Sequence, residues 1–173
     1  MRTPFLTLLA LAALCAPLLT GCSPSVRGSM ALSSGDYDRA LGLYGEALAS
    51  DPDSIYLRQR IGLTHFAKKD YANAETSFRE ILSLRPGEPN AAFYLGLSRI
   101  GKGERGPALE ELQGFSWPDK YYQQKFVREE AERLLRHPDM PAAETISCLK
   151  DALEEGRKKQ EESEREMTWG LRR

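Results

Sequence analysis

The sequence predicts an all-α fold: a short α-solenoid of two full and one shortened helix-turn-helix repeats, followed by two C-terminal capping helices. Between Gly28 and Leu112 the same residue types return every 34 residues, and a period of this length is typical of stacked repeats. Pro52 and Pro86 recur at the same spacing, where a proline can stop a helix. The residues expected to pack the repeats together are Gly28, Tyr37, Ala40, Tyr44, Gly62, Tyr71, Ala74, Phe78, Gly96 and Ala108.

This register resembles the tetratricopeptide repeat family over roughly half of the chain. The resemblance implies two antiparallel helices in each copy, expected in the second copy at about 55–68 and 71–84. Glycine inside a helix costs about 1 kcal/mol relative to alanine. Gly62 therefore predicts that another helix backbone passes close by, with Tyr71 and Phe78 filling the space beside the small residues.

Residues 1–21 are predicted to be a signal peptide and not part of the fold. Arg2 makes the start positive, and the uncharged apolar run from Phe5 to Leu19 is short for a membrane span. The segment Leu19-Thr20-Gly21-Cys22 resembles the bacterial lipobox. The resemblance implies cleavage after Gly21 and attachment of lipid to Cys22. The alternatives are an ordinary signal peptide cleaved nearby or an uncleaved anchor.

The expected location is the bacterial cell envelope. Ser23 follows Cys22 where an aspartate would be an inner-membrane signal in enteric bacteria, which implies the outer membrane, facing the periplasm. No long basic block stands out, so nucleic acid is not an expected partner. Cys148 is the single cysteine left after the signal and the lipidated residue, and it is expected to be a small packing residue.

The repeat region is expected to span residues 22–117. Its first helix, at about 26–34, is diluted by serines and predicted to be weak. In the third copy Arg105 replaces the repeated tyrosine, and the run from Gln113 to Pro118 ends the second helix early. The sequence therefore predicts a shortened helix there.

Residues 118–156 are expected to form the two capping helices that a stack of repeats needs at its open end. The predicted apolar stripe of the first is Tyr122, Phe126, Leu134 and Leu135; the predicted apolar face of the second is Ile146, Leu149 and Leu153. Residues 157–173 are a charged tail, interpreted as a solvated helix or a frayed end. This tail also contains three apolar residues at alternate positions, Met167, Trp169 and Leu171. They either dock on a partner or are disordered, and the charged composition of the tail favours disorder.

No catalytic residue, metal site or cofactor is predicted, and the chain is not expected to be an enzyme. His65 and His137 have no partner at metal-binding spacing, and His65 is expected to pack in a helix. The common nucleophile, metalloprotease and phosphate-loop motifs are missing from the sequence.

In the tetratricopeptide repeat family, the first helices of successive repeats line a concave groove that takes a peptide or a helix. The resemblance implies a protein-binding groove lined by Tyr56, Gln59, Leu63, Phe66, Asn90, Phe93, Leu97 and Ile100. Gln59, Leu63 and Phe93 do not match the family's Lys, Arg and Asn clamp for a carboxylate. Such an apolar groove is either open to a partner or covered by the chain's own C-terminal helices.

The expected function is a lipid-anchored, periplasm-facing scaffold that binds another envelope protein, in pilus, secretion or outer-membrane assembly. Cys22 would attach it to the membrane. One alternative is a homo-oligomeric structural lipoprotein, with the groove filled by a neighbouring chain. An alternative from another class is an envelope enzyme or an accessory subunit of one.

Overall fold

The computed structural model describes residues 23–170, and the predicted signal peptide and Cys22 lie outside this range. Within it the chain forms eight α-helices and no strand. They are α2 (Pro24–Ser33), α3 (Tyr37–Ser50), α4 (Ile55–Ala67), α5 (Tyr71–Leu84), α6 (Pro89–Gly101), α7 (Arg105–Gln113), α8 (Tyr121–Leu135) and α9 (Ala142–Gly170).

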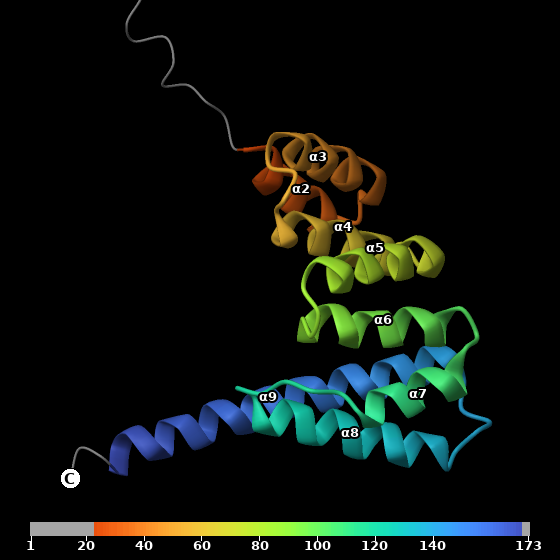
Figure 1. The fold of residues 1–173 in the computed structure, drawn as a ribbon, viewed down its shortest axis with the longest axis vertical. Coiled ribbons are helices and arrows are strands. Elements are labelled where there is room, and N and C mark those ends of the chain that lie inside the picture. The colour runs from red at the N-terminus through yellow and green to blue at the C-terminus, as the bar shows by residue number, and fades with distance from the viewer. Residues whose placement is uncertain (1–22, 171–173) are drawn as a thin grey trace, which may run out of the picture.

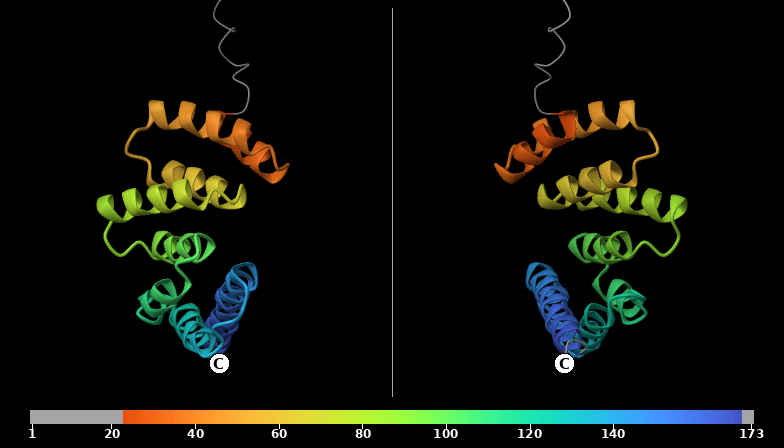
Figure 2. Two further views of the ribbon diagram at one scale, coloured as in Figure 1. Left: turned by 90° about the vertical axis from the view of Figure 1, so that its right-hand side faces the viewer. Right: turned by 90° about the vertical axis from the view of Figure 1, so that its left-hand side faces the viewer.

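The helices stack in chain order from α2 to α8, each packed against the next (Figure 1). The two side views of Figure 2 show the same order, with α8 and α9 together at the far end of the stack. Beyond its sequential neighbour α8, helix α9 also packs against α6. The predicted all-α solenoid with a two-helix cap is therefore confirmed.

The predicted helix pair of the second copy is confirmed, at 55–67 and 71–84. The predicted shortening of the third copy is also confirmed, because α7 has 9 residues whereas α3 and α5 have 14 each. Asp36 and Asp70 occupy equivalent N-cap positions, where each side chain accepts a hydrogen bond from a backbone N–H in the first turn. The 34-residue period thus extends to the caps of the second helices.

A glycine in the first helix of each copy faces a large side chain in the second helix. A Cβ added to Gly62 would lie 3.0 Å from ring atoms of Phe78. A Cβ added to Gly28 would lie 2.9 Å from the ring of Tyr44, and one added to Gly96 would lie 2.9 Å from the side chain of Leu112. Side-chain atoms, not the helix backbone expected from the sequence, are therefore what make glycine necessary at these positions. Ala40, Ala74 and Ala108, which come from the second helices, are all fully buried.

A buried carboxylate ties α5 to the turn between α6 and α7. Glu75 is 2% exposed and forms ion pairs with Arg79 and with Lys102, whose Nζ lies 2.5 Å from Glu75 Oε2. Lys102 also pairs with Glu104, and hydrogen bonds to both carboxylates raise its pKa, that to Glu75 most. These pairs satisfy a charge that would be costly to bury alone.

The cap differs in detail from the prediction. Val127, Ala131 and Leu134 are the buried apolar residues of α8, whereas Phe126 and most of the predicted stripe are only half-buried. The prediction is confirmed for Leu134, and Leu135 packs against the same cluster, but it is wrong for Tyr122 and Phe126. The reason is that both α7 and α9 pack on α8, which turns Val127 and Ala131 inward instead. The predicted face of α9 is confirmed, since Ile146 and Leu149 are buried and Leu153 packs on the same cluster.

The expected boundary at Gly156 is not a helix end, because α9 continues for 29 residues to Gly170. Gly156 instead lies where α9 passes close to the backbone of α8. A Cβ there would lie 2.7 Å from the Cα of Gln123 and 2.7 Å from the backbone oxygen of Tyr122. The interpretation of Met167 and Trp169 as disordered is wrong, since both lie in α9; Leu171 lies outside the described residues.

We expect Gly156→Ala to destabilise the protein, because the new methyl group meets a helix backbone that cannot rotate away. The expected loss in the free energy of unfolding is about 1–3 kcal/mol, measured by urea denaturation. Gly45→Ala is the matched control, since Gly45 is also helical but has nothing within 4 Å of an added Cβ. It should be neutral or stabilising by up to about 1 kcal/mol. Equal midpoints for the two variants would contradict the close crossing.

Candidate protein-binding cleft

The structure divides the predicted groove into an open half and a covered half. The predicted residues lie on two first helices: Tyr56, Gln59, Leu63 and Phe66 on α4, and Asn90, Phe93, Leu97 and Ile100 on α6. Those on α4 are half-buried or exposed. Three of the four on α6, namely Phe93, Leu97 and Ile100, are completely buried.

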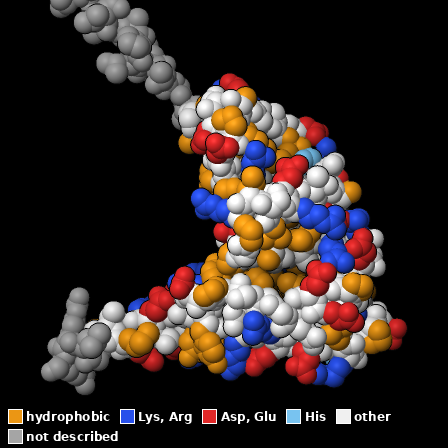
Figure 3. Space-filling view, in the orientation of Figure 1, with side chains coloured by type: hydrophobic (Ala, Val, Ile, Leu, Met, Phe, Trp, Pro, Cys, Tyr) orange, Lys and Arg blue, Asp and Glu red, His pale blue; other side chains and the backbone are white. Residues whose placement is uncertain are grey.

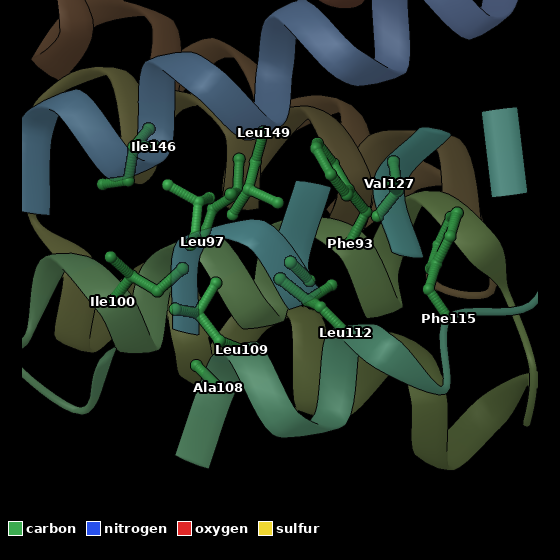
Figure 4. Close-up of a cluster of buried hydrophobic side chains, with 12 residues drawn as sticks. Phe93, Leu97, Ile100, Ala108, Leu109, Leu112, Phe115, Val127, Ile146 and Leu149 are labelled. Atoms are coloured by element: carbon green, nitrogen blue, oxygen red, sulfur yellow. The ribbon is translucent and has the colours of Figure 1, made fainter. Parts of the chain in front are cut away.

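Helix α9 covers the groove residues of α6. Ile146 and Leu149 of α9 belong to the same hydrophobic cluster as Phe93, Leu97 and Ile100, and Figure 4 shows their side chains converging. Of the two alternatives, the covered groove is therefore the one that holds for these three α6 residues, and they do not line an open binding wall. The physical reason is that the last helix folds back across α6 and buries apolar side chains worth about 1.5–3 kcal/mol each.

Arg105 holds this arrangement in place. It stands where the first two copies carry Tyr37 and Tyr71, and its guanidinium donates hydrogen bonds to the backbone oxygens of Leu134 (2.7 Å) and His137 (2.8 Å). Each carbonyl already accepts one backbone N–H, from His137 and Met140 respectively, so the guanidinium adds a second donor at the C-terminal end of α8 and in the turn beyond it. A third bond, 3.1 Å long, reaches the hydroxyl of Thr145 in α9. Sequence reasoning missed this role, although the replaced tyrosine was its signal.

An open cleft remains between the repeats and α9, and we call it the concave cleft. It consists of two pockets of about 410 Å³ and 450 Å³, which both include Tyr94 and Lys150. The first is lined by Leu63, Phe66, Ala67, Lys69, Tyr71, Tyr94, Ala143, Ile146 and Lys150. The second is lined by Asn90, Phe93, Tyr94, Trp117, Gln123, Lys150, Asp151, Leu153, Glu154 and Arg157. Figure 3 shows the molecule hollowed between the stack and α9, with hydrophobic side chains gathered beside the hollow.

Aromatic side chains form the floor of the concave cleft. The ring of Phe66 meets those of Tyr71 and Tyr94 edge-on, with centroids 5.5 Å and 5.4 Å apart. Tyr94 also contacts Phe93, with centroids 5.5 Å apart, and its burial raises the pKa of its hydroxyl. Edge-to-face rings of this kind hold one another in place. The cleft is therefore a preformed apolar surface. The predicted groove residues that line it are Leu63, Phe66, Asn90 and Phe93, whereas Tyr94, which both pockets share, was not predicted. The C-terminal helix was expected only as a cover of the groove and not as one of its walls.

A larger pocket of about 660 Å³ lies along the second half of α9 but is less suited to a ligand. Its lining is mostly charged: Phe126, Glu155, Lys158, Lys159, Glu162, Arg165, Glu166 and Trp169. Lys159 and Glu162 already pair with each other, one turn apart on the same helix. This surface is a solvated helix face with two aromatic residues at its edge.

The histidine nearest the cleft has a local role. His65 Nδ1 lies 3.2 Å from Asp70 Oδ2, which places the ring beside the turn between α4 and α5. Hydrogen bonds from Asn73 are the main reason why the pKa of the Asp70 carboxyl is lowered, and His65 adds to this effect. Within residues 23–170 no three His, Cys, Asp or Glu side chains gather in a way that could hold a metal ion.

Stacked helix pairs that enclose an apolar concave cleft define a class, the α-solenoid scaffolds, whose repeats bind other proteins along such surfaces.

Comparison with known proteins supports this class. The family model described as "Tetratricopeptide repeat" matches residues 26–89, which cover α2 to α5 and the turn into α6. A protein named "Photosystem I assembly protein Ycf3" from Acaryochloris marina (strain MBIC 11017) is 34% identical over 88 residues. The match covers 49% of this chain and 53% of the relative, so the chain spans about half the length of that relative. Residues 26–89 of this chain are thus similar to tetratricopeptide repeats, and repeats of this kind imply a protein-interaction scaffold.

The predicted lipid site, Cys22, lies outside the described residues. Among the helices of residues 23–170, none combines the length and the apolar character that crossing a bilayer requires.

We expect Phe93→Asp to lower the free energy of unfolding by about 3–5 kcal/mol, because it removes a buried ring and leaves a charge without a partner. Tyr56→Asp is the control, since Tyr56 was predicted to line the same groove but is 57% exposed. Its effect should stay within about 0.5 kcal/mol. If Phe93→Asp and the wild type unfold at the same urea concentration, α9 does not cover α6 in solution.

Proposed function

We propose that the protein is a lipid-anchored, periplasm-facing scaffold that binds another envelope protein and supports its assembly. The observation that carries the binding function is the concave cleft. It presents aromatic side chains from α4 and α6 at the surface although α9 has buried the rest of the groove. A monomer that needed only a core would have no reason to keep such a cleft open.

The assembly role is supported by the named relative, which is described as an assembly protein and matches 49% of this chain. A scaffold of this kind contributes no chemical step. It raises the local concentration of its partner at the membrane and holds one segment in a fixed conformation. Pilus, secretion and outer-membrane assembly are all processes in which such a holding function is useful.

The membrane part of the proposal rests on the sequence Leu19-Thr20-Gly21-Cys22. Helix α2 begins at Pro24, two residues after Cys22, so a lipid on Cys22 would keep the first repeat at the bilayer surface. The stack would then extend away from the membrane, which leaves the concave cleft accessible from the periplasm.

The anchor is tested by Cys22→Ser, which removes the thiol that would carry the lipid. We expect the variant to lose incorporation of radiolabelled palmitate and to leave the membrane fraction or accumulate as the precursor, since stable anchoring needs more than one acyl chain. Cys148→Ser is the control and should label like the wild type. A Cys22→Ser protein that still labels and still sediments with membranes would refute the lipoprotein assignment.

The binding function is tested by filling the concave cleft without removing any of its contacts. Ala143 is exposed and lines the first pocket, so Ala143→Trp should block it. After crosslinking in cells, quantitative mass spectrometry should show at least one envelope protein captured by the wild type but lost by Ala143→Trp. Ala72→Trp on the exposed face of α5 is the matched control and should keep the partner. If Ala143→Trp and Ala72→Trp capture the same proteins, the concave cleft is not the binding site.

A further inference from the structure

We propose that the concave cleft recognises a segment of its partner in which a carboxylate stands beside an apolar side chain. This inference rests on the proposed protein-binding function and adds the chemistry of the segment. It follows from the distribution of charge and unpaired polar atoms within the cleft.

The first pocket is apolar except for two lysines. Lys69 and Lys150 belong to its lining, and the other lining residues are aliphatic or aromatic. Within residues 23–170, neither lysine has a carboxylate within 4.0 Å of its nitrogen. Most other lysines of the folded part form ion pairs, for example Lys68 with Asp38 and Lys120 with Glu164. An apolar pocket with two unpaired cations suits an apolar side chain that is followed or preceded by an acid.

Lys69 occupies an unusual backbone position. Its φ is 63°, at the turn between α4 and α5, and the equivalent turns of the other copies carry Gly35 and Gly103. A side chain in this left-handed region costs about 1–2 kcal/mol relative to a relaxed conformation. Glycine would avoid the cost, as it does in the two neighbouring copies. Residues held in such conformations cluster at ligand-binding sites, and here the strained residue is one of the two cations of the pocket.

The second pocket adds a hydrogen-bond acceptor. Gln123 lines it and is 5% exposed, and its Oε1 has no donor among the described residues. A buried carbonyl oxygen without a partner costs about 1–3 kcal/mol. A backbone N–H of an extended segment would satisfy it once the amide group turns toward the pocket, while Trp117 and Tyr94 would contact an apolar side chain.

The same observations argue against a polyanion such as nucleic acid or an anionic membrane surface. Asp151 and Glu154 line the second pocket beside Arg157, and Arg157 is already paired with Glu154. Positive charge is therefore concentrated at Lys69 and Lys150. One carboxylate fits this arrangement, and a run of phosphates would meet the two acids.

The test selects peptides from a random display library on the full-length protein purified in detergent. We expect the selected peptides to share an Asp or Glu next to an aromatic or aliphatic residue. The probe for the next step is a fluorescent synthetic copy of the most enriched peptide, together with a copy in which the acid is replaced by its amide. The amide copy should bind about tenfold more weakly, and added salt should weaken the acidic peptide more than the amide copy.

The variant Lys150→Glu should weaken the acidic peptide by about tenfold or more, and a peptide with lysine in place of the acid should recover binding to this variant. Lys158→Glu is the matched control, since it makes the same change on the same helix, outside the lining of both pockets. It should leave the affinity within about twofold. Circular dichroism of each variant confirms that the fold is retained.

Several outcomes would overturn the proposal. They are the absence of any enriched peptide, enrichment of peptides without an acid, and equal affinities for wild type and Lys150→Glu. A change in sedimentation on Lys150→Glu would instead identify a second copy of this chain as the occupant, and would also overturn it. If Ala143→Trp still abolishes capture in cells while Lys150→Glu does not, the scaffold function stands and only the acidic-segment inference fails.

Discussion

The contact between a glycine of each first helix and a large side chain of the second is the constraint on which the rest of the structure depends. Gly28, Gly62 and Gly96 leave room for Tyr44, Phe78 and Leu112. The glycines weaken their own helices, but they allow each pair to pack closely enough to bury a large side chain. Since the pairs are equivalent, each stacks on the next with the same geometry. The curvature that produces a concave face follows from this repetition.

The solenoid also needs an end, and α9 provides more than a cap. It seals the cluster around Leu97 and forms the far wall of the concave cleft. Arg105 couples these two roles, because it replaces the repeated tyrosine and bonds instead to the turn that directs α9 back across α6. The capping element is thus part of the binding surface, so the site is built from both repeat and non-repeat segments. A partner that binds here contacts residues separated by about half of the chain.

The polar groups of the molecule divide into two kinds. Some structural ones are held in ion pairs, as Glu75 is by Arg79 and Lys102. Those of the cleft are not: Lys69, Lys150 and the Oε1 of Gln123 lack protein partners within the described residues. Native interiors rarely leave polar groups unpaired. Arg58 Nε, outside the cleft, is also buried without a hydrogen bond, and Lys69 and Lys150 are exposed; what distinguishes the cleft is that its two cations lie beside an apolar surface.

The sequence by itself determined the helical repeats, their bounds and the shortened α7. These depend on local signals, namely the 34-residue period, the caps and the proline stops. Only the tertiary structure decided which groove residues remain accessible. The covering of Phe93 and Leu97 depends on where α9 crosses α6, and this crossing is set by Arg105 and by the close approach at Gly156. The spacing of apolar residues indicates which face of a helix is buried, but not which other helix packs against it. The α9 wall of the cleft and the buried face of α8 therefore depend on tertiary packing.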